Sequence, residues 1–107
     1  MSDECKVTID AGVCKMITVV TAKPNPETGM VDVEIQSDCP NILRMSWTLQ
    51  PICPYSEVEG AMNETDVYKL ASDNIPHAAC PVPCGMIKAI EVAGGLGLKR
   101  DVTIKVE

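Results

Sequence analysis

Aromatic side chains are nearly absent from this chain, which contains no Phe, two Tyr and one Trp. Its interior must therefore be packed mainly with Val, Ile, Leu and Met. At 107 residues the chain has the length of one small domain with one modest core. We find no internal repeat, low-complexity tract or domain boundary, and we therefore predict a single domain over residues 1–107.

Positive charge is also scarce. The 9 Lys and Arg residues are outnumbered by 15 Asp and Glu residues, and no basic cluster exceeds the pair Lys99 and Arg100. Binding of nucleic acid needs a basic face, and attraction to an anionic membrane surface needs one as well. We therefore expect no nucleic-acid partner and no membrane partner, and we leave a protein partner or a homodimer open.

Long apolar runs are missing too. No stretch approaches the roughly 20 apolar residues of a membrane-spanning helix. Residues 1–10, MSDECKVTID, lack the basic and apolar regions of a secretion signal. We therefore expect a cytoplasmic protein, in a compartment that keeps thiols reduced. In that compartment the six Cys residues favour metal binding or thiol chemistry over disulfides.

Alternating apolar and polar residues predict four strands, at residues 5–10, 16–22, 30–36 and 101–107. The last of these, DVTIKVE, follows the glycine-rich stretch that should end the preceding helix. Strands with one apolar face need helices on that face only.

Helical patterns lie between the third and fourth strands. We expect a helix from Pro40 to about Gln50, a short one over residues 65–72 capped by Asn63, and a long one over residues 83–93 with Ile90 facing inward. Residues 51–64 have the composition of an irregular connection, in which three carboxylates are interpreted as solvated charge: Glu57, Glu59 and Glu64. The order βββ-α-(α)-α-β predicts an α+β fold. Its sheet should be three- to four-stranded and mainly antiparallel, with two main helices packed on one face.

Alternating chain directions place most of the Cys residues together. Cys14 follows the first strand, Cys39 follows the third, and the long helix should begin at the same end with His77, Cys80 and Cys84. Two Cys residues, Cys5 and Cys53, should lie at the opposite end. We therefore expect the sulfur atoms of Cys14, Cys39 and Cys80 to lie within about 10 Å of one another, because short connections join strands at one edge.

The predicted metal ligands are Cys14, Cys39, Cys80, Cys84 and His77. Cys thiolates, with a His as a further ligand, hold tetrahedral zinc or an iron–sulfur cluster. The usual Cys-x-x-Cys pairs are absent, however, and only Cys80 and Cys84 are close in sequence. The hypothesis is therefore a small metal- or iron–sulfur-binding protein.

Two alternatives stay open. One is a thiol-based redox protein or enzyme without metal, using Cys39 or Cys80, because both precede helices whose N-termini stabilise thiolates. On that basis we expect Cys39 or Cys80 to react with an alkylating reagent before Cys5. The other is a non-catalytic interaction module in which the Cys residues are small buried hydrophobes.

The segments GVC, SDCPN and PHAACPVPCG, with AIEVAGGL and DVTIKVE at the end, resemble a family over nearly the whole chain. It is a small uncharacterised, cysteine-containing domain family of anaerobic bacteria and archaea with no established activity. The resemblance implies a single-domain cytoplasmic protein. It marks Cys14, Cys39, His77 and Cys80 as the positions of interest.

Overall fold

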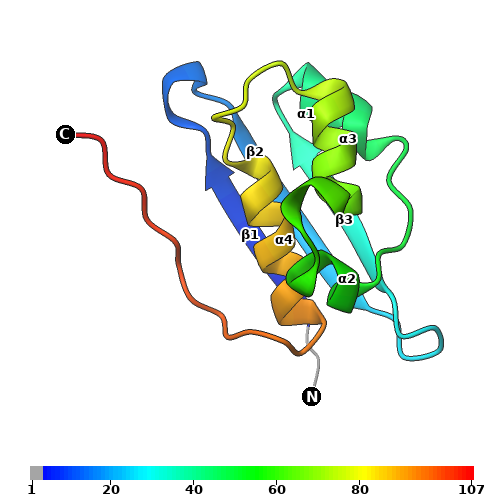
Figure 1. Ribbon diagram of the computed structural model, residues 1–107. Coiled ribbons are helices and arrows are strands. Elements are labelled where there is room, and N and C mark those ends of the chain that lie inside the picture. The colour runs from blue at the N-terminus through cyan, green and yellow to red at the C-terminus, as the bar shows by residue number, and fades with distance from the viewer. Residues whose placement is uncertain (1–3) are drawn as a thin grey trace.

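The computed structural model describes residues 4–107 and contains a three-stranded antiparallel sheet in the order β1-β2-β3 (Figure 1). The strands are β1 (Cys5–Asp10), β2 (Ile17–Pro24) and β3 (Val31–Ser37). They lie within two residues of the first three predicted strands. In the β1–β2 register Val7 pairs with Val20 and Ile9 with Thr18, so these side chains share the inner face of the sheet.

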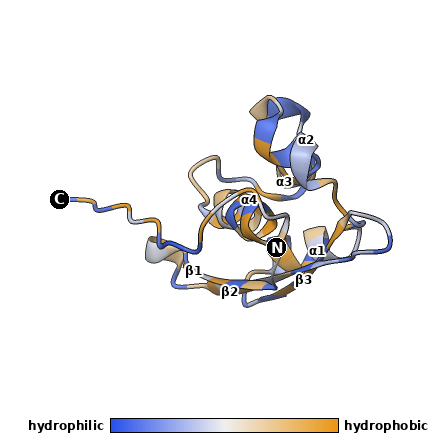
Figure 2. Cartoon of the chain, turned by 90° about the horizontal axis from the view of Figure 1, so that it is seen from below, coloured by the Kyte–Doolittle hydropathy of each residue, from blue (hydrophilic) through white to orange (hydrophobic). Residues whose placement is uncertain are grey.

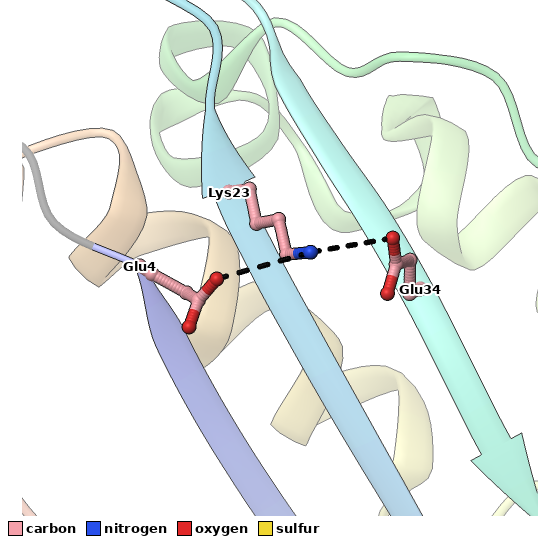
Figure 3. A network of polar contacts seen from close by, with 3 residues as sticks. All are labelled: Glu4, Lys23 and Glu34. Carbon is pink, nitrogen blue, oxygen red and sulfur yellow. Dashed lines mark hydrogen bonds and ion pairs between the residues drawn. The ribbon is translucent and has the colours of Figure 1, made fainter.

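The outer face of the sheet is mainly polar. Lys23 of β2 lies between two carboxylates, with its Nζ 3.9 Å from Oε1 of Glu4 and 3.5 Å from Oε1 of Glu34 on β3 (Figure 3). All three side chains are exposed, and exposed ion pairs contribute little to stability. The arrangement does show that the outer face follows the alternation expected from the sequence.

Four α-helices follow the strands: α1 (Pro40–Ser46), α2 (Pro54–Glu59), α3 (Asp66–Asn74) and α4 (Val82–Ala93). All lie on the inner face of the sheet, with α1 and α4 directly on the strands and α2 and α3 farther out (Figure 2). Short 3-10 turns form η1 (Gly12–Cys14) and η2 (Met62–Glu64). The α+β fold with helices on one face is confirmed. None of the helices between residues 4 and 107 is long and apolar enough to cross a membrane.

Helix α4 is the centre of the core. Met86 and Ile90 are fully buried, as the helical pattern predicts for Ile90. The helix approaches β1 so closely that a Cβ at Gly85 would collide with the side chain of Ile9. The absence of a side chain at Gly85 therefore sets the distance between helix and sheet.

The middle of the chain is more helical than predicted. Helix α1 ends at Ser46 rather than near Gln50, where the backbone N–H groups of Thr48 and Leu49 turn back to the carbonyls of Met45 and Ser46. Residues 51–64 contain α2 and η2 instead of an irregular connection. The six residues of α2 and the three residues of η2 are each too few to show a helical period in sequence.

The cap of α3 was also wrongly predicted. The hydroxyl of Thr65, not the side chain of Asn63, accepts a hydrogen bond from the backbone N–H of Tyr68 at 3.2 Å. Both residue types are good N-caps, so the choice depends on where the chain turns, and η2 moves that point two residues onward.

The predicted fourth strand is wrong. Residues 101–107 form no strand, all of them are exposed, and the segment runs apart from the sheet (Figure 1). Its alternation is real, but alternation specifies only that one face is apolar. A strand also requires an edge to pair with, and here the segment pairs with none of the described strands.

Candidate functional site

Cys39 is held by polar contacts at the end of β3. The Ser37 hydroxyl accepts the backbone N–H of Cys39 at 3.1 Å and shares a hydrogen bond of 2.7 Å with the buried hydroxyl of Thr18. Asp38 exchanges two bonds with Ile17, since its carboxylate accepts the Ile17 N–H at 3.3 Å and its own N–H donates to the Ile17 carbonyl. The SDC segment is therefore attached to the start of β2, which follows η1 and Cys14.

Cys80 lies in the turn that leads into α4. Its backbone N–H donates to the carbonyl of His77 at 3.1 Å, and its side chain packs against the hydrophobic core, as does that of Cys39. His77 itself is exposed. Cys84, in the first turn of α4, is exposed as well. The thiols of Cys80 and Cys84 therefore have different surroundings although they are close in sequence.

The loops that carry Cys14, Cys39, His77 and Cys80 lie at the same end of the sheet (Figure 1). Cys53 follows Ile52, which bridges to Val31 at the opposite end of β3. The two ends are those that the alternation of directions predicts. Yet among residues 4–107 no three His, Cys, Asp or Glu side chains form a group that could hold a metal ion. The structure thus brings the loops together without assembling a ligand set.

Cys53 is the thiol that sequence reasoning missed. It is the N-cap of α2, and the hydroxyl of Ser56 donates to its backbone carbonyl at 3.1 Å. The backbone N–H of Ser56, and then its hydroxyl, lie near enough to the thiol to favour the thiolate and lower the pKa of Cys53, although partial burial and the charge of Glu57 oppose this effect. A signal was present in the sequence, because Cys53-Pro54 repeats the Cys-Pro pairs that precede α1 and α4.

Cys5 behaves in the opposite way. It is buried on the inner face of β1, with 6% of its surface exposed. Burial raises the pKa of the Cys5 thiol, and the charge of Lys99 counteracts that rise. Lys99 therefore lies near the start of β1, so that the chain leaving α4 passes the base of this strand before it departs from the sheet.

Glu57 is a second residue that sequence reasoning misjudged. It was interpreted as solvated charge, but only 4% of it is exposed. Its carboxylate accepts the backbone N–H groups of Asp66 at 2.8 Å and Val67 at 2.9 Å, the first two residues of α3. A carboxylate at a helix N-terminus satisfies N–H groups that lack helical partners. Glu57 therefore joins α2 to α3 and has a structural role.

Two shallow hollows indent the described surface. The first, of about 190 Å³, lies between α2, α3 and α4 and contains Cys84 beside Tyr68. Burial, and then the neighbouring Cys84, raise the pKa of the Tyr68 phenol. The second, of about 320 Å³, lies between α3 and the chain after α1. No His lines either hollow, and in the first the Lys88 ammonium is paired with Glu91 at 3.4 Å. Neither hollow gathers a recognisable catalytic set.

Four exposed large apolar side chains lie close together in sequence within residues 98–107, hereafter the C-terminal segment. Exposed fractions are 88% for Leu98, 56% for Val102, 77% for Ile104 and 94% for Val106. Such side chains are normally found where a surface is covered by a partner. The outer edge of β1 is open as well, because β1 pairs only with β2 among the described strands. The segment and this edge form the candidate interaction site.

Comparison with known proteins identifies a family. The model of a family of unknown function (DUF6951) matches residues 5–106. The chain belongs to this family. The DUF6951 match includes β1, every helix and nearly all of the C-terminal segment, so the segment is part of the family's domain. No curated protein and no solved structure matches the chain.

Proposed function

We propose that this DUF6951 domain is a non-catalytic interaction module that docks on a partner protein by strand addition through its C-terminal segment. The observation that carries the proposal is the exposure of Val102, Ile104 and Val106 in strict alternation with polar residues. An extended peptide of this pattern adds to an open sheet edge, with backbone hydrogen bonds for affinity and alternate side chains for specificity.

Energetics support this proposal. Burying a Val, Leu or Ile side chain contributes roughly 1.5–3 kcal/mol, and the segment has four such side chains in water. Association costs several kcal/mol in lost freedom, which burial of these four can offset. A site for small molecules has less support. The first hollow, of about 190 Å³, is small for a ligand pocket and its Lys88 ammonium is already paired with Glu91, and the second has charged side chains but neither a His nor a Cys.

Crosslinking in cells tests the proposal. A photo-crosslinking residue at Thr103, on the polar side of the segment, should give a dominant adduct whose attachment maps to a strand edge of the partner. The same residue at Ser72, exposed on α3, is the matched control. Ile104→Asp should remove the adduct and leave the thermal unfolding midpoint unchanged. Equal labelling from Thr103 and Ser72 positions would mean that the segment has no specific partner.

A second candidate function is binding of zinc or an iron–sulfur cluster by Cys14, Cys39, Cys80, Cys84 and His77. It is favoured by the shared end of the sheet at which the loops carrying Cys14, Cys39 and Cys80 lie (Figure 1). A metal would have to draw these loops together. Anaerobic purification with metal analysis and a visible spectrum tests it. Near one zinc or one cluster per chain, lost in Cys39→Ser and kept in Cys53→Ser, is the supporting result.

Without metal, one fast-reacting thiol among Cys39 and Cys80 would support thiol chemistry instead. If the protein contains no metal and neither thiol reacts faster than it does in the unfolded chain, metal binding and thiol chemistry are both excluded. The interaction module then remains.

A further inference from the structure

We propose that the partner is a second copy of this chain, and that residues 101–106 of each copy add as a parallel strand to the outer edge of β1 of the other. This inference rests on the proposed interaction function and identifies its partner. The residues of the β1 edge identify the partner, because their charges and apolar side chains complement those of the C-terminal segment.

The receiving edge is open along its whole length. β1 forms its ladder with β2 only, so the outward N–H and C=O groups of residues 5–10 have no strand partner among the described residues. The opposite edge is less accessible, because Ile52 exchanges two backbone hydrogen bonds with Val31 on β3, at 2.8 and 2.9 Å. An open edge is a template for another extended chain.

Charge defines the register. If the segment runs parallel to β1 with Thr103 beside Thr8, then Asp101 lies beside Lys6 and Lys105 lies beside Asp10. Both are opposite-charge pairs on the exposed outer face. Neighbouring opposite charges on adjacent strands are stabilising and like charges are destabilising.

The apolar side chains fit the same register. Val102 then lies beside Val7, and Ile104 beside Ile9, on the face that packs against α4. A shift by one residue would place these side chains on the outer face. If the segment instead ran antiparallel to β1, still with Thr103 beside Thr8, then Lys105 would lie beside Lys6 and Asp101 beside Asp10. These like-charge pairs make the antiparallel arrangement unfavourable.

The conformation of the segment favours exchange between copies. The chain passes the base of its own β1 at Lys99 and then runs in the same direction as β1, but apart from it (Figure 1). The preceding turn contains Gly95 with a φ of 76°, a left-handed conformation that suits Gly. A two-fold axis along β1 keeps both β1 strands parallel, so each segment can pair with the β1 edge of the other copy. Such a contact is closed, and it produces dimers rather than fibres.

Charge reversal on the two sides tests the proposal with the full-length chain. The edge variant carries Lys6→Asp and Asp10→Lys, and the segment variant carries Asp101→Lys and Lys105→Asp. In a homodimer of either variant, like charges face each other in both pairs of each exchange. The Kd of that homodimer, measured by analytical ultracentrifugation, should therefore rise at least about tenfold. A tenfold change corresponds to about 1.4 kcal/mol.

Mixing the two variants restores opposite charges in both exchanges and should restore dimerisation to the wild-type level. A chain that carries all four changes should also dimerise. The rescue on mixing is specific to exchange, because pairing of a segment with its own β1 would stay mismatched in each variant. Circular dichroism confirms that each variant is folded.

Four results would overturn the inference. Dimers of unchanged strength in both variants would place the interface elsewhere. A monomer with segment amides protected from hydrogen exchange would show pairing with its own β1. A monomer whose Thr103 position crosslinks in cells to a different protein would overturn self-association while leaving the proposed interaction function intact. Absence of every crosslink from Thr103 would instead remove the proposed function as well.

Discussion

The buried carboxylate of Glu57 accepts a hydrogen bond from the backbone N–H of Val67 at 2.9 Å, across ten positions of the chain. The neighbouring N–H of Asp66 donates to the other carboxylate oxygen at 2.8 Å. One side chain of α2 thereby satisfies two of the N–H groups that α3 cannot satisfy itself. The position of α3 over the core depends on this contact.

Glu57→Ala should lower the free energy of unfolding by about 1–3 kcal/mol, because it leaves a buried N–H group unsatisfied. Glu57→Gln should cost less, since the amide oxygen can still accept one of the two bonds. The control is Glu59→Ala, which removes an exposed carboxylate two residues later in α2. Denaturant unfolding measures the three variants. Equal effects of Glu57→Ala and Glu59→Ala would contradict the capping role.

Ile90 lies at the centre of the buried face of α4, with 0% of its surface exposed. Ile90→Ala should destabilise the domain by about 2–5 kcal/mol, because it removes buried methyl groups and leaves a cavity. The exposed Ser72→Ala change in α3 is the control. A loss under about 0.5 kcal/mol for Ile90→Ala in denaturant unfolding would mean that the neighbouring side chains are not tightly packed there.

Gly85→Ala should destabilise the domain through a collision with Ile9 rather than through helix propensity. Ala is the better helix former by about 1 kcal/mol, so any net loss reports the steric effect. We expect a net loss of about 1–3 kcal/mol, the usual range for overpacking. In the Ile9→Ala background the same change should be neutral or stabilising, because the colliding atoms are gone. Additive losses in this double-mutant cycle would rule out the steric explanation.

Thiol reactivity should distinguish Cys53 from Cys5 in the metal-free, reduced protein. The lowered pKa of Cys53 moves the pH midpoint of its alkylation rate below that in the unfolded chain, and the raised pKa of Cys5 moves its midpoint above it. Near neutral pH, Cys53 should therefore be labelled well before Cys5. Mass spectrometry of a labelling time course measures both positions.

Ser56→Ala is the matched variant for this measurement. It removes the hydroxyl, one of the two Ser56 groups that lower the pKa of Cys53, and keeps the backbone N–H, so the midpoint of Cys53 should rise part of the way toward the unfolded value. The same time course tests whether Cys39 or Cys80 reacts before Cys5. Labelling of Cys5 before Cys39, Cys53 and Cys80 would contradict the burial of Cys5 on β1.

Local pattern was enough for much of the fold. The alternation in residues 5–10, 16–22 and 30–36 predicted the three strands, because period two leaves one face for the core. The helical period over residues 83–93 predicted α4 and the burial of Ile90. One-sided strands predicted that all helices would share one face, and alternating directions predicted which Cys residues lie at each end.

Tertiary structure decided what local pattern leaves open. Glu57 is buried because α3 offers it two N–H groups from a segment nine and ten residues onward, and no local rule anticipates such a partner. Residues 101–107 alternate as a strand does, yet a strand exists only where an edge accepts it. The loops of Cys14, Cys39 and Cys80 likewise share one end of the sheet, yet within residues 4–107 no three candidate side chains form a group that could hold a metal ion, because ligation needs side chains that converge within a few ångströms. The sequence alone determined which faces are apolar, whereas the folded chain determined which of those faces found partners.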